Sequence, residues 1–153
     1  MVSESKKVRE ILFRGQTRRY GEKVRMGDGF KLPSRWVYGG VLQGVSAHSI
    51  IYGGENVDDP GDGLDKWCVY TDTLGQFTGL TDKNGKRIFE GDILKRTNGN
   101  KYVWYVDYKN CAFCANQSNC NYACELGELL DQIELEIIGN IHDNPELLEG
   151  CDG

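Results

Sequence analysis

Short apolar runs alternate with polar, glycine-containing breaks along the whole chain, and this pattern predicts strands rather than long helices. Between the first two runs, residues Gly15–Arg35 are polar and basic with little periodicity, which indicates a long loop or a mobile hairpin. The pair Gly39-Gly40 indicates a β-bulge in the second strand, and Gly53-Gly54 is expected to end the third. The predicted strands, rich in Val, Ile, Tyr and Trp, cover Val8–Arg14, Trp36–Leu42, Ser49–Tyr52, Trp67–Tyr70 and Lys101–Tyr108.

The run Thr73–Leu94 predicts a β-hairpin. It contains the pair Asn84-Gly85 within Asp82–Lys86. An Asn-Gly pair is favoured where both central residues of a tight turn have a positive φ, so we expect that conformation at both positions. A further turn is expected at Asn98–Asn100.

In the C-terminal third, the spacing of the apolar residues fits both a helix and a strand. Five apolar residues have helical spacing, yet the segment Ile133–Ile137 alternates as a strand does. We interpret Glu125–Leu130 as a short helix or turn and Ile133–Ile141 as a strand. Asn144 and Pro145 suit the N-cap and first position of a final helical turn. The five apolar residues are Leu126, Leu129, Leu130, Ile133 and Ile137.

The predicted fold is therefore mainly β, a β-rich α+β protein. Antiparallel hairpins would form small barrel-like sheets with one or two short helices. A length of 153 residues suits a single domain, 1–153, either undivided or made of two small lobes, about 1–65 and 66–153. The 20 glycines against 3 prolines agree with many tight turns, because a glycine share of about 7% is usual.

The composition of the chain indicates the compartment in which the protein is expected. No stretch approaches the roughly 18 consecutive apolar residues of a membrane-spanning helix, and no apolar segment of the kind found in signal peptides follows Met1–Lys7. We therefore expect a cytoplasmic protein with no membrane partner. In that compartment the six cysteines are expected to be thiols or metal ligands rather than disulfides.

Charge is distributed unevenly along the chain. Residues 1–35 carry ten Lys/Arg against four acids, whereas residues 125–153 carry nine acids and no Lys or Arg. The opposed ends predict an attraction within the fold or between subunits, or contact of the basic end with an anionic partner. Self-complementarity is the favoured interpretation, and a homo-oligomer is expected. A tentative basic binding surface comprises Arg18, Arg19, Lys23, Arg25, Lys31 and Arg35.

Four segments carry a family resemblance. Arg9–Gly15 and Trp36–Gly39 are similar to the opening of the YopX family of phage and prophage proteins, Thr73–Leu94 to its central signature, and Ile137–Leu147 to its closing one. The resemblance covers most of the chain in the family's order. It implies a phage or prophage origin, a β-rich fold and self-association, and it brings no established activity and no catalytic residues.

Two segments depart from the family pattern, the basic insert Lys23–Arg35 and the cysteine-rich segment Cys111–Cys124. The second could supply a zinc site, since zinc favours four soft ligands. Against this hypothesis, the segment has no histidine, the gap between the pairs fits neither common zinc pattern, and residues three apart on a strand point to opposite faces. Ordinary thiols are the favoured interpretation, without a bound metal or cofactor. The four cysteines are Cys111, Cys114, Cys120 and Cys124.

The Asp-rich segment Asp58–Asp65 resembles a calcium loop at first sight. Pro60 and Val69, however, occupy positions where an EF-hand loop needs oxygen ligands, so a solvated turn is favoured.

Catalytic chemistry finds little support in the sequence. The two histidines, His48 and His142, lie in no motif that pairs them with a nucleophile or a metal. Glu90 and Asp92 could form an acid–base pair, but Asp92 is better suited to accept hydrogen bonds from backbone amides at the Gly91 turn.

The leading prediction is a non-enzymatic accessory protein that acts by protein–protein interaction, with itself and with a host or phage protein. The alternative is a nucleic-acid-binding module that uses Arg9–Arg35, with or without zinc at the four cysteines. Its support is the interleaving of Tyr20, Phe30 and Trp36 with basic residues, a composition found on single-strand-binding surfaces. An enzyme is a third hypothesis, which would need a cleft with perturbed acids.

Overall fold

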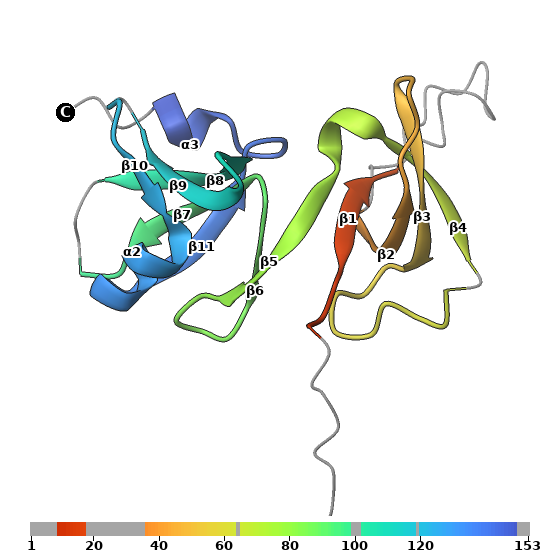
Figure 1. Ribbon diagram of the computed structural model, residues 1–153, viewed down its shortest axis with the longest axis horizontal. Helices are drawn as coiled ribbons and strands as arrows, with labels where there is room; N and C mark the ends of the chain where they lie inside the picture. Colours follow the sequence, from red (N-terminus) through yellow and green to blue (C-terminus); the bar gives the residue numbers. More distant parts are fainter. Residues whose placement is uncertain (1–8, 18–35, 64, 99–101, 119, 150–153) are drawn as a thin grey trace, which may run out of the picture.

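Two antiparallel β-sheets make up the chain in the computed structural model, which describes residues 9–17, 36–63, 65–98, 102–118 and 120–149 (Figure 1). The first sheet has the order β4-β3-β2-β1-β5-β6 and the second β10-β9-β8-β7-β11. The first contains β1 (Phe13–Gln16), β2 (Trp36–Leu42), β3 (His48–Gly54), β4 (Lys66–Tyr70), β5 (Gly75–Thr81) and β6 (Arg87–Phe89). The second contains β7 (Asp92–Arg96), β8 (Val103–Lys109), β9 (Ala112–Gln117), β10 (Ala123–Glu125) and β11 (Leu135–Asn140).

Helices are few and short in the described residues: the 3-10 turn η1 (Thr71–Thr73), α2 (Leu126–Gln132) and α3 (Glu146–Glu149). The mainly β fold is thus confirmed. The first sheet curls, because Thr17 at the end of β1 forms a bridge with Val69 of β4. This single bridge does not close a barrel within the described part of the chain. None of the helices there is long and apolar enough to cross a membrane.

The change of sheet falls between β6 and β7, at the Glu90–Gly91 turn. We call β1–β6 the N-lobe, and β7–β11 with α2 and α3 the C-lobe. Figure 1 shows them side by side, with β5 and β6 running between them. The sequence suggested two lobes divided near residue 65. The change of sheet lies later in the chain, because β4, β5 and β6 follow residue 65 and still belong to the first sheet.

Several predicted elements are confirmed by the structure. Strand β2 has the predicted bounds, the hairpin β5–β6 forms around Asp82–Lys86, and a helix followed by a strand resolves the ambiguous C-terminal period as α2 and β11. The last helical turn is α3, after Pro145. The expected turn at Asn98–Asn100 falls mostly outside the described residues, as does most of the expected Gly15–Arg35 loop.

The first strand is later than expected, since Arg9–Leu12 is not in a strand and β1 begins at Phe13. The expected bulge at Gly39-Gly40 is also wrong, because the β2–β3 register runs without a shift and includes Gly53-Gly54. These glycines serve close strand approach instead. A Cβ at Gly39 would collide with the backbone oxygen of Tyr52. Register shifts occur between Phe77 and Thr81 and between Ile137 and Gly139.

The β5–β6 turn differs from the expected one in its backbone. Gly85 has a positive φ of 81°, but Asn84 does not. The cause is Asp82, whose buried Oδ1 accepts hydrogen bonds from the backbone N–H groups of Asn84 and Lys86, so the loop has three residues and glycine is needed only at its end. The turn with two positive φ values lies instead at Asn110 and Cys111, 52° and 62°.

Three apolar clusters support the sheets. The largest lies mainly in the C-lobe, where the helix α2 packs against the second sheet, and it includes Ile88 of β6 from the N-lobe. A second, in the N-lobe, contains Val37, Ile51 and Val69. The third lies next to the junction of the lobes and contains Leu12, Phe77 and Phe89. The largest comprises Ile88, Leu94, Trp104, Val106, Ala115, Leu126, Leu129 and Leu135.

Candidate functional site

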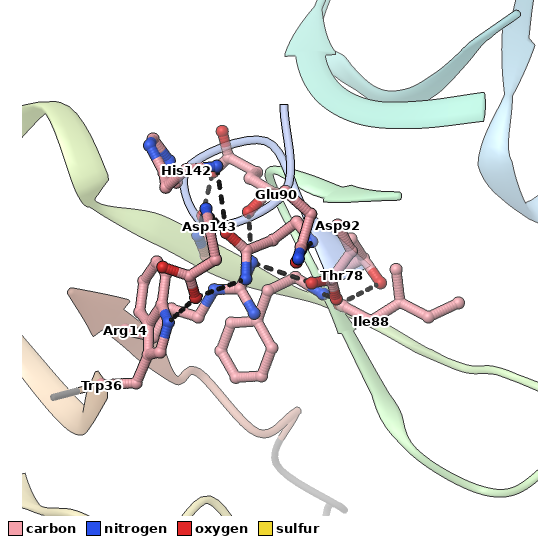
Figure 2. A network of polar contacts seen from close by, with 12 residues as sticks. Arg14, Trp36, Thr78, Ile88, Glu90, Asp92, His142 and Asp143 are labelled. Atoms are coloured by element: carbon pink, nitrogen blue, oxygen red, sulfur yellow. Dashed lines mark hydrogen bonds and ion pairs between the residues drawn. The ribbon is translucent and has the colours of Figure 1, made fainter. Parts of the chain in front are cut away.

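A buried arginine occupies the junction between the lobes. Arg14, on β1 of the N-lobe, is only 6% exposed. Its Nη2 lies 2.9 Å from Oδ1 of Asp92 on β7, and also donates a hydrogen bond of 3.1 Å to the backbone oxygen of Glu90 (Figure 2). The guanidinium lies over the rings of Trp36 and Phe89, 4.6 and 4.9 Å from their centroids. Its buried Nε has no hydrogen-bond partner among the described residues.

Asp92 links this ion pair to the backbone of the turn. Its Oδ2 accepts a hydrogen bond of 2.8 Å from the N–H of Phe89, and Gly91 between them has a φ of 90°. The predicted contact of Asp92 with a backbone amide is therefore confirmed, whereas its ion pair with Arg14 was not predicted. Burial raises the pKa of Asp92, and the charge of Arg14 opposes that rise.

Glu90 also binds a backbone group. Its Oε1 accepts a hydrogen bond of 3.0 Å from the N–H of Gln76 on β5. Burial raises the pKa of Glu90, the bond from Gln76 lowers it, and the carboxylate of Asp107 raises it further. The side chain of Glu90 thus binds the turn between the lobes to β5 of the N-lobe. The side chain of Asp92 binds the C-lobe to Arg14 of the N-lobe and to the N–H of Phe89 just before the turn.

The segment after β11 completes the junction. Asp143 accepts hydrogen bonds from Nε1 of Trp36, at 2.8 Å, and from the side chains of Gln16 and Asn140. Burial acts to raise the pKa of Asp143, but these hydrogen bonds outweigh it and the pKa is lowered. The N-terminal part of the chain therefore contacts the acidic C-terminal part of the same molecule, through uncharged donors.

His142 lies beside Asp143, with its ring 5.9 Å from that of Trp36 (Figure 2). Burial lowers the pKa of His142, and the charge of Arg14 lowers it further, while Asp143 and Asp72 act in the opposite direction.

A cleft of about 420 Å³ adjoins this network and is lined by both lobes. The N-lobe contributes the β3–β4 loop, the β5–β6 turn and the side chains of Arg14 and Tyr38, and the C-lobe contributes Asp92 and Ile137. Burial raises the pKa of the Tyr38 hydroxyl. The remaining lining residues are Val57, Asp58, Asn84, Gly85, Lys86, Arg87 and Phe89.

The cleft has a charged rim. Nη1 of Arg87 lies 2.8 Å from Oδ1 of Asp58, and Nε lies 3.4 Å from a carboxylate oxygen of Glu10. These groups are accessible to solvent, with side-chain exposures of 25% for Arg87, 81% for Asp58 and 48% for Glu10. Lys86 is exposed beside them. The rim pairs are therefore weak, unlike the buried pair of Arg14 and Asp92.

The predicted basic surface falls outside the part of the chain that the structure describes. Its six residues, together with Tyr20 and Phe30, lie outside the described residues. Trp36, the remaining aromatic of that hypothesis, belongs to the junction. The six are Arg18, Arg19, Lys23, Arg25, Lys31 and Arg35.

The four clustered cysteines occupy different surroundings. Cys111 lies in the β8–β9 turn and Cys120 after β9, both exposed. Cys114 is opposite Glu125 in the β9–β10 ladder, one position from the pair of Cys124 and Ala115, so the two thiols lie on opposite faces. In the described part of the chain, no group of three or more His, Cys, Asp or Glu residues could hold a metal ion. The five described cysteines are free.

In the Asp-rich loop, side chains bind the loop's own backbone or the rim. Asn56 accepts a hydrogen bond from the N–H of Asp58, and Asp59 accepts one from the N–H of Gly61. Asp58 pairs with Arg87. These are the contacts of a solvated turn, the interpretation favoured from the sequence.

Sequence reasoning missed the junction residues Arg14, Gln16 and Asp143. One signal was present for Arg14, a charge directly after the apolar run Ile11–Phe13 and before Gly15. An arginine inside a strand that turns toward a core needs a buried partner. Nothing in the local sequence names that partner.

Comparisons with known proteins gave one family match and a partly similar solved structure. A solved structure, "Crystal structure of protein EF1440 from Enterococcus faecalis", shares 32% sequence identity with the chain. That similarity covers 55% of this chain and 69% of the other, with a TM-score of 0.37. A comparison with curated proteins gave no match. The family model described as YopX protein matches residues 46–149, which confirms the resemblance, and the chain therefore belongs to the YopX family.

Proposed function

We propose that this YopX-family chain is a non-enzymatic accessory protein of a phage or prophage, and that it acts in the host cytoplasm by holding a segment of another protein in the cleft between its lobes. The partner is a host or phage protein. The observation that carries this proposal is the cleft itself, about 420 Å³ in volume and lined by residues of both sheets.

The lining suits a peptide better than a reacting small molecule. Apolar surface from Val57 and Ile137 lies beside hydrogen-bonding groups of the β5–β6 turn. Such a mixture, with arginine among the lining residues, is typical of protein interfaces. The lining carboxylate of Asp92 supports a non-enzymatic role, because it is held by Arg14 and by the N–H of Phe89.

Selection from a randomised peptide display library tests the proposal. We expect enriched peptides to bind the wild-type protein and to protect the backbone amides of Val57 and Arg87 from hydrogen exchange. The variant Val57→Arg should lose this binding. Val45→Arg is the matched control, because Val45 is fully exposed on the β2–β3 turn, away from the lining residues. Peptides that bind Val57→Arg as tightly as the wild type would contradict the proposal.

Self-association is part of the proposal and has its own test. The opposed charges of the two ends favour contact between chains, so association should weaken as salt screens them. Sedimentation velocity at rising ionic strength measures this. A single monomeric species at every salt concentration would contradict it.

Binding of nucleic acid through Arg9–Arg35 is the competing hypothesis, and a gel-shift assay at low salt decides between the two. Affinity for phosphate is greatest at low salt and falls steeply as salt rises. A shift with single-stranded oligonucleotides in the absence of any peptide binding would replace the proposed function with this one.

A further inference from the structure

Arg87 on the cleft rim is held by carboxylates of its own chain. Its pairing with Asp58 is short, 2.8 Å, but its two contacts with Glu10 are both 3.4 Å. Charge-assisted bonds between nitrogen and oxygen are usually about 2.7–2.9 Å. Glu10 is half exposed and precedes Ile11, which is 60% exposed, so little apolar burial holds it in place. The contact of Glu10 with Arg87 is therefore easily exchanged.

Donors exceed available acceptors along the cleft. Arg14, Lys86 and Arg87 all line it. Of the two lining carboxylates, Asp92 is engaged by Arg14 and by a backbone N–H, and Asp58 by Arg87. The buried Nε of Arg14 still has no partner among the described residues. A buried donor without an acceptor is destabilising.

We propose that the cleft takes an acidic segment of the partner protein. A carboxylate of that segment replaces Glu10 on Arg87, and a neighbouring apolar side chain packs against Val57 and Ile137. Glu10 thus acts as an intramolecular competitor for the partner. This inference rests on the proposed function and names the chemistry of its ligand.

The same surface is poorly suited to nucleic acid. The ring of Phe89 is 2% exposed, so it offers no face on which a base could stack. An acidic peptide needs no stacking face, so this surface favours it over a nucleic acid.

Fluorescence anisotropy with two labelled octapeptides tests the inference. One alternates glutamate and leucine, and the other has glutamine in place of each glutamate. We expect the acidic peptide to bind about tenfold more tightly, since hydrogen bonds to charged groups are the stronger ones. Arg87→Gln should remove that preference. The side-chain Nε–H resonance of Arg14 should shift on addition of the acidic peptide.

The decisive variant is Glu10→Gln, which removes the competitor without touching the cleft floor. It should strengthen binding of the acidic peptide by about two- to fivefold, the range expected for loss of an exposed ion pair. Asp131→Asn, an exposed acid on α2, is the matched control and should change nothing. Urea unfolding of each variant verifies that the fold is retained.

The outcomes separate the two proposals. If both peptides bind equally and Val57→Arg abolishes both, the cleft binds peptides but the preference for acid is wrong. If Glu10→Gln binds the acidic peptide with unchanged or weaker affinity, the inference is wrong, but the proposed function is not affected. If neither octapeptide binds while library-selected peptides do, the acidic ligand is wrong. If no peptide of any kind binds, the proposed function fails as well.

Discussion

The core of the C-lobe consists of buried apolar side chains, whereas the junction between the lobes contains a buried pair of charged side chains. Leu94, Val106 and Leu126 are essentially inaccessible to solvent and meet only other apolar side chains in their cluster. At the junction, Arg14 and Asp92 are almost as deeply buried, yet they are charged. The core can relax around a lost methyl group, whereas the junction cannot easily accommodate the loss of one charge.

The two regions also differ in how far apart their contacts lie in sequence. Core residues of β7, β8 and β9 come from consecutive hairpins. The junction joins Arg14 to Glu90 across 76 positions and Gln16 to Asp143 across 127. Local pattern therefore builds the hairpins of each lobe. The long-range pairs β1–β5 and β7–β11, and the contacts between the polar groups of the two lobes, form only in the finished fold.

Asp92→Ala should have the largest effect on stability. It leaves the buried guanidinium of Arg14 without its carboxylate and removes the acceptor for the N–H of Phe89. We expect a loss of about 3–5 kcal/mol in the free energy of unfolding, measured by urea denaturation with circular dichroism.

The double variant Arg14→Met, Asp92→Leu is the control for this prediction. It replaces both charges with apolar groups, and buried pairs exchanged in this way are often neutral. Recovery of most of the stability would show that the cost comes from the unpaired charge. A single variant that loses less than about 1 kcal/mol would place the pair among weak surface bridges.

Leu94→Ala tests the apolar core of the C-lobe. Leu94 is fully buried between β8 and β11, so its truncation should leave a cavity and cost about 2–4 kcal/mol. Leu94→Met, which conserves volume, should cost less than about 1.5 kcal/mol. If both variants cost the same, packing at this position is not what stabilises the C-lobe.

Much of each lobe followed from the sequence, and the junction did not. The alternation in Trp36–Leu42 and the turn chemistry of Asp82–Lys86 are local, so they predicted β2 and the β5–β6 hairpin correctly. The positive φ expected at Asn84 was wrong because Asp82, buried against β11, imposes a longer loop. A local rule failed there because a tertiary contact decided the backbone.

The candidate site was harder to predict for the same reason. Glu90 and Asp92 were recognised as a pair near a glycine turn, and the backbone contact of Asp92 was predicted. Its ionic partner, Arg14, lies on a strand whose register places it beside β5. That register depends on the whole sheet, so no spacing in the sequence encodes the pairing.

Asp82→Ala tests how the β5–β6 turn is fastened to the C-lobe. Oδ1 of Asp82 accepts two backbone hydrogen bonds within the turn, and Oδ2 accepts one of 3.0 Å from the N–H of Ile137. Losing these acceptors should cost about 2 kcal/mol and speed hydrogen exchange at Ile137. Asp82→Asn keeps one oxygen and should cost less. Unchanged exchange at Ile137 in both variants would contradict this role.

Cys111→Gly should stabilise the protein slightly. Cys111 has a φ of 62°, a conformation that costs most L-residues about 1–2 kcal/mol and glycine nearly nothing. Part of the gain is offset by the greater freedom of glycine in the unfolded chain, so we expect about 0.5–1 kcal/mol in urea unfolding. Cys111→Ala retains the Cβ and should give no such gain. A destabilised glycine variant would show that the thiol makes a contact worth more than the strain.

The smallest effect concerns acidification of the junction. Burial and Arg14 depress the pKa of His142 below its usual 6.5 in the folded protein. Above pH 6.5 both folded and unfolded states carry the neutral ring. As pH falls through 6.5 toward the depressed value, the unfolded state binds the proton first, so stability decreases and then levels off. The raised pKa values of Glu90 and Asp92 act in the opposite direction, because the folded state then takes up protons first.

Comparing urea unfolding of the wild type with that of His142→Gln between pH 7.5 and about 5 isolates the histidine, since both carboxylates remain in each protein. The wild type should lose stability relative to the variant on acidification. Parallel curves would mean that folding does not depress the pKa of His142, although its ring packs against Trp36.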